Sequence, residues 1–280
     1  MKIKHSDVLV DVIRALEEDV GTGDISAALL PAQLTATVEI ISREPMLVCG
    51  RPWVDAVFKQ MHADTEVNWL VQEGEWLQYP TTLCQIKGNA AAILTAERTA
   101  LNFLQTLSAT ASQVYLYLQQ LKGSKTQLLD TRKTIPGLRL AQKYAVACAG
   151  AKNHRLGLYD AFLIKENHIK ACGSITKAIE KARKMHHSAY LEVEVESLDE
   201  LAEALLAKPD RILLDNFSKL MLTKAVEINQ SHQCELEASG GIDLSNIVEI
   251  AQTGVNYISV GAMTKSIKAI DLSLLIKDVK

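Results

Sequence analysis

The chain has 280 residues, of which 48% are hydrophobic and 22% charged, with a formal net charge of −3. With a mean hydropathy of +0.05 and an isoelectric point near 6.2, these values are typical of a soluble globular protein of one large or two smaller domains. They exclude a general nucleic-acid binder, which would carry a basic excess, but they are compatible with a local basic site for a small anion.

The amino terminus and the cysteines indicate the compartment. The first 20 residues lack the apolar core of a signal peptide, and no apolar stretch reaches the length of a membrane span. The five cysteines are widely spaced without a C-x-x-C pair, which favours reduced thiols in a cytoplasm over a structural zinc site. We therefore expect a cytoplasmic protein that binds neither nucleic acid nor membrane.

The first 90 residues are predicted to combine a short helix with several strands. Apolar residues recur at helical spacing over residues 6–18, and the breaker-rich segment EDVGTGDIS follows. The segments TATVEIIS, TEVNWLV and LCQIKG alternate or are β-branched, which predicts an antiparallel or mixed sheet. Residues 90–121, beginning AAILTAERTALNFLQTL, are predicted to form one or two helices.

From residue 126 onward, short apolar runs alternate with helical segments at intervals of roughly 20 to 30 residues. Strands are predicted at residues 126–130, 161–165, 190–195, 211–215, 234–239 and 256–260. This alternation indicates parallel βα units, which build either a barrel or a doubly wound sheet.

The residues at the ends of these strands favour the barrel. Nearly every run ends in residues suited to chemistry: Asp130 with Arg132 and Lys133, Lys165, Glu194, Asp215, Ser239 with Gly240, and Gly261. In a barrel the carboxyl ends of all strands meet at one mouth, whereas a doubly wound sheet gathers only those near its switch point. Six recognisable strands are fewer than eight, so we predict an incomplete or irregular barrel.

The polar residues at this mouth form a basic set and an acidic set. The basic set is Arg132, Lys133, His154, Arg155, Lys165 and His168, and the acidic set is Glu194 and Asp215 on consecutive strands. Magnesium prefers one or two carboxylates together with substrate phosphate oxygens. Arginine offers a planar fork that matches a carboxylate or a phosphate. The combination predicts a polyanionic substrate that arrives with a divalent metal.

Several of these residues also have structural interpretations. Arg132 and Lys133 could be a solvated loop pair, and His154 and Arg155 could cap a helix end. Glu192, Glu194 and Glu196 share one face of a strand, but their direction is open, and Glu192 and Glu196 are candidates for structural salt bridges.

Glycines after the last two strands predict a phosphate site, because glycine permits close approach of the backbone. The segments are Ser239-Gly240-Gly241 and Val260-Gly261-Ala262. The first of them taken alone would more often be a simple turn. Arg98 lies in a helical segment crowded with apolar residues, which suits either an ordinary surface or an interface.

Taken together, the motifs resemble the quinolinate phosphoribosyltransferase family. The matching landmarks, in order, are EDVGTGDIS, ERTALNFLQ, DTRKTIPGLR, NHRLGLYDAFLIKENHI, LEVEVESLDEL, ILLDNF, EASGGI and ISVGAMTKS. The resemblance covers nearly the whole chain, and DTRKT followed by NHR…GL.D…IK.NH is its most specific part.

The resemblance implies a fold, an assembly and a reaction. The fold is an α/β sandwich domain over residues 1–108, joined by the tail 268–280, and an open, roughly seven-stranded α/β barrel over residues 109–267. A homodimer is implied, in which Arg98 completes the neighbouring subunit's site. The reaction transfers a phosphoribosyl group from phosphoribosyl pyrophosphate to quinolinate with decarboxylation, giving nicotinate mononucleotide for NAD biosynthesis, with Mg²⁺ as the cofactor.

The resemblance also implies a role for each site residue. Thr131, Arg132, Arg155 and Lys165 would bind quinolinate with His154 nearby, Lys133 would approach both substrates, and His168 would lie on the phosphoribosyl side. Glu194 and Asp215 would position the ribose hydroxyls and magnesium, and would act in catalysis with Lys133. The segments 239–241 and 260–262 would bind the 5′-phosphate through backbone donors.

Three alternatives stay open at this stage. A related phosphoribosyltransferase could act on another anion, although three arginines (Arg98, Arg132 and Arg155) are excessive for a single carboxylate. A barrel lyase could form a Schiff base on Lys165 or Lys133. A non-catalytic anion-binding protein is the third, and it would bind substrate without releasing pyrophosphate.

Overall fold

The computed structural model describes all residues, 1–280, and they form two compact units. The amino-terminal unit comprises Met1–Tyr115, Ile135–Gly150 and Ser266–Lys280, and the carboxy-terminal unit comprises Leu116–Thr134 and Ala151–Lys265. Residues 135–150 group with the amino-terminal unit by their contacts, although they follow residues 116–134 of the carboxy-terminal unit in the chain. None of the helices combines the length and the apolar character needed to cross a membrane.

The amino-terminal unit is built on a four-stranded antiparallel sheet, as expected from its alternating segments. Its order is β12 (Leu272–Val279), β1 (Thr35–Ser42), β5 (Thr82–Asn89) and β3 (Glu66–Trp69). Alternate residues of β1 are buried, so one face of the strand contributes to the core. The short strands β2 (Met46–Leu47) and β4 (Trp76–Leu77) form a separate pair.

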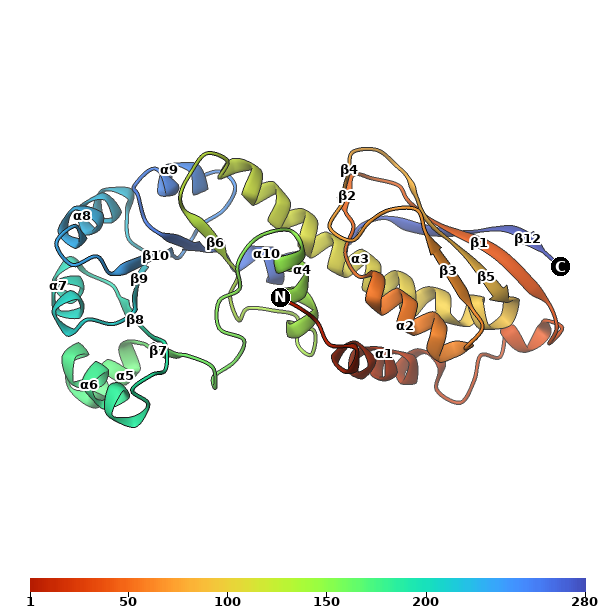
Figure 1. The fold of residues 1–280 in the computed structure, drawn as a ribbon, viewed down its shortest axis with the longest axis horizontal. Coiled ribbons are helices and arrows are strands. Elements are labelled where there is room, and N and C mark those ends of the chain that lie inside the picture. The colour runs from red at the N-terminus through yellow and green to blue at the C-terminus, as the bar shows by residue number, and fades with distance from the viewer. The chain divides into compact units, whose positions relative to one another are not determined.

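Helices of the same unit contribute to the hydrophobic core together with this sheet (Figure 1). They are α1 (His5–Val20), α2 (Arg51–Met61), the first part of α3 (Ala90–Gln120) and α4 (Arg139–Cys148), whereas the 3-10 turn η1 (Ala27–Leu29) has no buried residue. The segment 90–121 forms one helix, α3. The sequence did not predict α2, which begins after Gly50 with no side-chain cap and buries five apolar residues in a row of six. When nearly every residue of a segment is apolar and buried, the helical spacing of apolar residues cannot be recognised in the sequence.

The carboxy-terminal unit is an open sheet of six parallel strands. Its order is β6 (Gln127–Leu129), β11 (Tyr257–Ser259), β10 (Glu235–Ser239), β9 (Arg211–Asp215), β8 (Leu191–Val195) and β7 (Phe162–Ile164). All six predicted strands are confirmed, each within two residues of its expected ends. A single parallel bridge between Leu129 and Lys152 extends the sheet beyond β6, and no pairing joins that end to β7. The barrel is open, as predicted.

Helices lie on the outer side of the curved sheet (Figure 1). They are α5 (Glu166–Cys172), α6 (Ile175–Met185), α7 (Leu198–Ala207), α8 (Lys219–Asn229), α9 (Ile247–Ala251) and α10 (Ala262–Lys265). The start of α6, α7 and α8 is capped by a serine hydroxyl, from Ser174, Ser197 and Ser218. Sharp helix starts fix the βα loops, and these loops surround the mouth of the barrel.

Candidate active site

A cavity of about 410 Å³ opens at the carboxyl ends of the parallel strands. It is lined by Thr131, Arg132, Lys133, His154, Arg155, Leu163, Lys165, Glu194, Leu213, Asp215, Glu237, Ser239 and Ser259. Residues of the basic set and both predicted carboxylates thus share one opening. A second cavity, of about 550 Å³, lies in the amino-terminal unit between α1, α3 and residues 135–138, and none of its lining residues lines the first cavity.

Two arginines form the cationic part of the cavity. The Nε atoms of Arg132 and Arg155 are buried and have no hydrogen-bond partner in the protein. Burial, and then the neighbouring Arg132 charge, lower the pKa of the Arg155 guanidinium. A buried donor without a partner is costly, so an anion that accepts from both guanidinium groups would be strongly favoured here.

The two predicted carboxylates lie on the neighbouring strands β8 and β9. Glu194 is ion-paired with Lys165 from the end of β7, and its side chain is only 9% exposed. Asp215 ends β9 and accepts a hydrogen bond from the Asn216 side chain at 2.8 Å. Both offer hard oxygen atoms at the cavity wall, which is the donor type that magnesium prefers.

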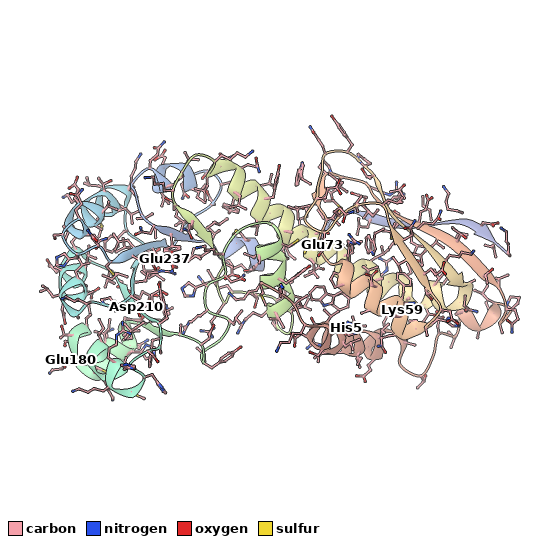
Figure 2. All side chains as sticks on the ribbon, viewed as in Figure 1. His5, Lys59, Glu73, Glu180, Asp210 and Glu237 are labelled. Carbon is pink, nitrogen blue, oxygen red and sulfur yellow. The ribbon has the colours of Figure 1, made fainter.

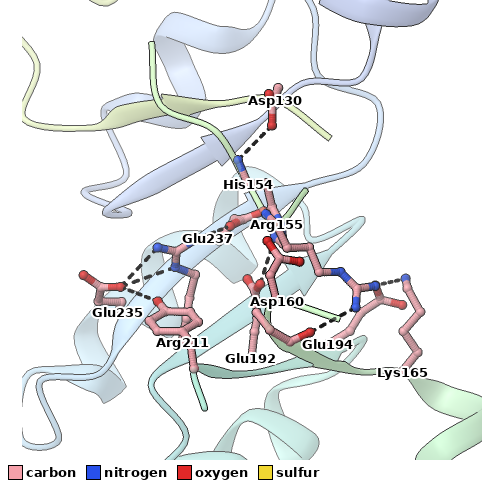
Figure 3. Close-up of polar contacts among 12 residues, drawn as sticks. Asp130, His154, Arg155, Asp160, Lys165, Glu192, Glu194, Arg211, Glu235 and Glu237 are labelled. Atoms are coloured by element: carbon pink, nitrogen blue, oxygen red, sulfur yellow. Dashed lines mark hydrogen bonds and ion pairs between the residues drawn. The ribbon is translucent and has the colours of Figure 1, made fainter. Parts of the chain in front are cut away.

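A layer of polar groups includes His154 and Glu237, which line the cavity, and their buried neighbours (Figure 3). His154 Nε2 contacts Glu192 Oε2 at 2.8 Å, while His154 Nδ1 accepts from the Arg155 backbone N–H at 2.7 Å. Glu237 Oε1 lies 3.7 Å from His154 Nε2, and Arg211 donates to Glu237 Oε2 at 3.0 Å. The Nδ1 atom of His154 thus faces the main chain, and its Nε2 atom faces the two carboxyl groups. His154 therefore helps to fix the backbone N–H of Arg155.

Sequence analysis missed one member of this layer. Glu237 of β10, labelled in Figure 2, is fully buried, and it was not a candidate. Glu192 was a candidate only for a structural salt bridge, and its Oε2 atom lies 2.8 Å from His154 Nε2. The signal was present, because Glu235 and Glu237 alternate on β10 as Glu192 and Glu194 alternate on β8.

Burial raises the pKa of Glu192 to about 7 and that of Glu237 to about 7, with Glu192 the next largest cause at Glu237. A carboxyl group whose folded pKa exceeds its unfolded value stabilises the fold fully below the unfolded pKa. That contribution is lost as the pH rises through the folded pKa. The wild-type protein should therefore lose stability between pH 4.5 and about 7. Because the two carboxyl groups are neighbours, the loss belongs to the pair rather than to either residue.

Replacing Glu237 by glutamine should flatten this pH dependence. The variant has no buried charge to form, so relative to wild type it should gain up to about 3 kcal/mol in unfolding free energy between pH 5 and 8. Urea unfolding at several pH values measures this gain. Glu235→Gln is the matched control, because burial raises the pKa of Glu235 but hydrogen bonds from Tyr190, Tyr257 and Arg211 outweigh it. The pKa of Glu235 is lowered, so that variant should change with pH in the opposite direction.

Two aspartates hold the segment that carries His154 and Arg155. Asp130 is fully buried and accepts from the Asn153 side chain at 2.7 Å and from the His154 backbone N–H at 2.8 Å. Asp160 accepts from the backbone N–H groups of Leu156 and Gly157, at 2.6 and 3.0 Å. The motif NHRLGLYD is therefore fixed at both ends, which positions the arginine between them.

In both glycine segments the backbone lies close to other atoms of the protein. Gly240 has φ +93°, and a Cβ there would lie 2.1 Å from Asn216 Oδ1. A Cβ on Gly261 would lie 3.1 Å from Lys133 Cδ and 3.3 Å from Thr131 Oγ1. Gly241 also has positive φ, Val260 is buried, and Ala262 begins α10. Ser239, the first residue of one segment, and Ser259, just before the other, line the cavity.

Besides residues 240–241 and 260–262, two predicted site residues, His168 and Arg98, do not line the cavity. His168 is exposed, and its Nδ1 accepts from the Lys165 backbone N–H at 3.0 Å, so it caps the start of α5. Arg98 is exposed on α3 in the amino-terminal unit. The EDVGTGD motif contacts the same helix, because Thr95 donates to Asp24 Oδ2 at 3.0 Å and Thr99 to Asp19 Oδ2 at 3.3 Å. These bonds flank Arg98.

Comparison with known families gives matches over most of the chain. Residues 24–108 match the family described as quinolinate phosphoribosyl transferase, N-terminal domain, and residues 109–275 match its C-terminal domain. The chain is 39% identical to the nicotinate-nucleotide pyrophosphorylase [carboxylating] of Mycobacterium leprae, over 96% of this chain and 97% of that protein. It is 36% identical to the probable enzyme of that name from Bacillus subtilis, over 92% and 89%.

Solved structures are similar as well. The nicotinate-nucleotide pyrophosphorylase from Francisella tularensis matches with a TM-score of 0.95 and 48% identity, over 99% of this chain and 98% of that one. The human nicotinic acid phosphoribosyltransferase matches with a TM-score of 0.65 at 13% identity, over 97% and 74%. At that identity the likeness shows the fold alone, so the fold does not by itself select the acid.

Proposed function

The chain belongs to the quinolinate phosphoribosyltransferase family, and from this premise we propose that it transfers a phosphoribosyl group from phosphoribosyl pyrophosphate to quinolinate with decarboxylation. The products are nicotinate mononucleotide, pyrophosphate and carbon dioxide. The enzyme is a pentosyltransferase of NAD biosynthesis. The observation that most directly supports this proposal is a pair of buried Nε donors without a partner, on Arg132 and Arg155. They lie in a cavity that also holds two carboxylates.

The proposed binding mode uses the charge of each wall. Quinolinate carries two carboxylates on adjacent ring carbons, and they would accept from Arg132, Arg155 and Lys165, with Thr131 beside them. His154 would act through its hydrogen bonds, which hold the Arg155 backbone. Pairing with a dianion would also relieve the repulsion between the two guanidinium groups that contributes to the lowered pKa of Arg155.

The phosphoribosyl side would lie toward the late strands. Backbone groups of residues 239–241 and 260–262 would receive the 5′-phosphate. Gly241 faces open space, which permits close approach of a ligand, whereas Gly240 and Gly261 allow the chain to pass close to Asn216 and Lys133. Lys133 would lie between the two substrates, since its side chain passes against Gly261 and lines the same cavity as Arg132. His168 would act near this side through the start of α5.

The acidic wall fits a magnesium ion by the chemistry of its donors. Glu194 and Asp215 would hold the ion together with pyrophosphate oxygens. When bound, magnesium neutralises charge on the leaving pyrophosphate. Lys165, which is paired with Glu194 in this structure, would then be free to turn toward a quinolinate carboxylate.

In the first step the pyridine nitrogen attacks the anomeric carbon as the bond to pyrophosphate breaks. Positive charge develops on the ribose ring, and the carboxylates of Glu194 and Asp215 would stabilise it. Lys133 would stabilise the negative charge that develops on the departing oxygen. These side chains supply orientation and charge, so the step needs no protein nucleophile.

In the second step the ring loses its 2-carboxylate as carbon dioxide. The carbon–carbon bond breaks and its electron pair stays on the ring carbon, where the adjacent cationic nitrogen stabilises it. A proton then replaces the carboxylate. Arg132 and Arg155 would hold the remaining carboxylate and so keep the ring in place.

Two further expectations extend the proposal. One is a homodimer in which Arg98 reaches the site of the neighbouring subunit, which agrees with its exposure on α3. The other is a cytoplasmic location, which agrees with five free cysteines.

Comparing quinolinate with nicotinate tests the substrate assignment. With phosphoribosyl pyrophosphate and magnesium present, quinolinate should react with a kcat/KM at least about 1,000-fold higher, because nicotinate leaves a buried arginine unpaired. Steady-state release of pyrophosphate measures both reactions. Equal turnover of the two acids would contradict the assignment to quinolinate and favour a related transferase.

A further inference from the structure

Two cysteine thiols meet in the amino-terminal unit, outside the site described above. Cys49 lies just before α2, and Cys148 is the last residue of α4. Their sulfur atoms and a carboxylate oxygen of Glu73 all lie within 4.8 Å of one another; Glu73 is among the residues labelled in Figure 2. The two cysteines come from separate chain segments, Met1–Tyr115 and Ile135–Gly150, which the unit brings together.

The carboxylate of this group is already engaged. Glu73 Oε1 accepts from the Gly50 backbone N–H and from the Tyr144 hydroxyl, each at 2.9 Å, and Glu73 Oε2 accepts from the Arg51 backbone N–H at 3.2 Å. Glu73 thus caps the start of α2 and ties α4 to it. A metal would have to displace these donors, so the two sulfurs are the reactive part of the cluster.

The two thiols differ in their surroundings. Cys49 is fully buried, and its backbone is clamped by Ser108, which accepts from the Cys49 N–H at 3.1 Å and donates to its carbonyl at 3.0 Å. Burial, with smaller contributions from Cys148 and Glu73, raises the pKa of the Cys49 thiol well above its ordinary value. Cys148 is only partly buried and ends a helix, so it is the thiol that a small oxidant reaches.

The Cys148 sulfur faces Gly74, so no side chain at that position restricts it. A Cβ on Gly74 would lie 3.6 Å from Cys148 Sγ, which is an ordinary contact distance. A disulfide needs sulfur atoms about 2.05 Å apart, and rotation of the Cys148 side chain supplies movement of this order. The clamped Cys49 would stay in place.

We propose that Cys49 and Cys148 form a reversible disulfide when the protein meets a peroxide. The Cys148 thiol attacks hydrogen peroxide, the O–O bond breaks, and the products are a sulfenic acid on Cys148 and one water. The Cys49 sulfur then attacks the Cys148 sulfur, the S–O bond breaks, and the proton of Cys49 leaves with the hydroxyl as a second water. The two thiols are oxidised by two electrons in total, and the peroxide is reduced.

The bond closes a ring that spans residues 49–148 and links two separate segments of one unit. A cross-link over so long a stretch restricts the unfolded chain and should raise the melting temperature of the oxidised protein. The proposal does not depend on the reaction catalysed at the other site, since it involves neither the cavity nor its residues.

Peptide mapping of the full-length protein tests the proposal. The protein is treated with hydrogen peroxide, alkylated under denaturing conditions and digested without reductant. We expect a peptide pair joined through Cys49 and Cys148, loss of two of the five thiols, and full recovery with dithiothreitol. Cys148→Ser should abolish the loss. Cys172→Ser is the matched control, because Cys172 is the last residue of α5 and is also partly buried. This variant should still lose two thiols on oxidation.

Three outcomes would overturn the proposal. One is oxidation of Cys148 to a sulfinic acid without any linked peptide. Another is a set of disulfides that join Cys148 to other cysteines or to other molecules. The third is tight binding of zinc by the reduced wild-type protein that is lost in Cys148→Ser, because it would show that the cluster is a metal site.

Discussion

Replacing Arg132 by alanine should raise the KM for quinolinate by about 30- to 1,000-fold, with a smaller effect on kcat. The guanidinium lines the cavity with a buried Nε donor that has no protein partner, so a bound carboxylate would be its partner. Losing one member of a desolvated charge-assisted pair costs about 2–4 kcal/mol, which corresponds to that change. Initial rates at saturating phosphoribosyl pyrophosphate give the KM.

Arg132→Lys separates charge from geometry. Lysine keeps the positive charge but lacks the fork, so its KM should fall between those of the wild type and the alanine variant. Arg183→Ala is the matched control, because Arg183 lies in the same unit, is ion-paired with Asp210 at 3.0 Å, and does not line the cavity. An unchanged KM in Arg132→Ala, or an equal rise in Arg183→Ala, would remove Arg132 from the site.

Replacing Asp215 by asparagine should lower kcat by about 100- to 1,000-fold, with little change in the KM for quinolinate. The substitution keeps the shape of the side chain and an oxygen for the Asn216 amide, but it removes the negative charge at the end of β9. That charge would stabilise the cationic sugar in the transition state and hold magnesium, and losing one such preorganised group typically costs this much.

The magnesium dependence distinguishes Asp215 from a residue that only shapes the cavity. The concentration of magnesium that gives half-maximal rate should rise in Asp215→Asn. Asp210 is the control, because it lies next to the other end of β9 and is paired with Arg183. Asp210→Asn should leave both kcat and the half-maximal magnesium concentration unchanged. A variant at Asp215 that changed only the KM for quinolinate would contradict the assignment of this carboxylate to the phosphoribosyl side.

The parts of the fold that could be predicted are those with a local signal. Parallel strands buried on both faces appear as short apolar runs, so 211–215 was predicted with the bounds that β9 has. Chemistry at the carboxyl ends follows from the topology of parallel βα units, and this is why Arg132, Lys165, Glu194 and Asp215 were expected at one mouth.

The parts that could not be predicted depend on contacts between distant segments. Whether Glu192 faces the barrel interior depends on the curvature of the sheet. Glu237 has its role only because it meets His154 from a loop and Arg211 from β9. His168 has a residue type that suits a site, yet its nitrogen caps a short helix that has no period to recognise. The placement of residues 135–150 in the amino-terminal unit likewise rests on long-range bonds, such as the one from Gln142 to Thr110.

The most direct test of the proposed activity is the stoichiometry of the reaction with the purified wild-type protein. Quinolinate labelled in its 2-carboxyl group is incubated with phosphoribosyl pyrophosphate and magnesium, and labelled carbon dioxide, pyrophosphate and nicotinate mononucleotide are quantified together. The account predicts equal amounts of all three, and no carbon dioxide without phosphoribosyl pyrophosphate. Carbon dioxide released in its absence, or pyrophosphate released without the nucleotide, would contradict it.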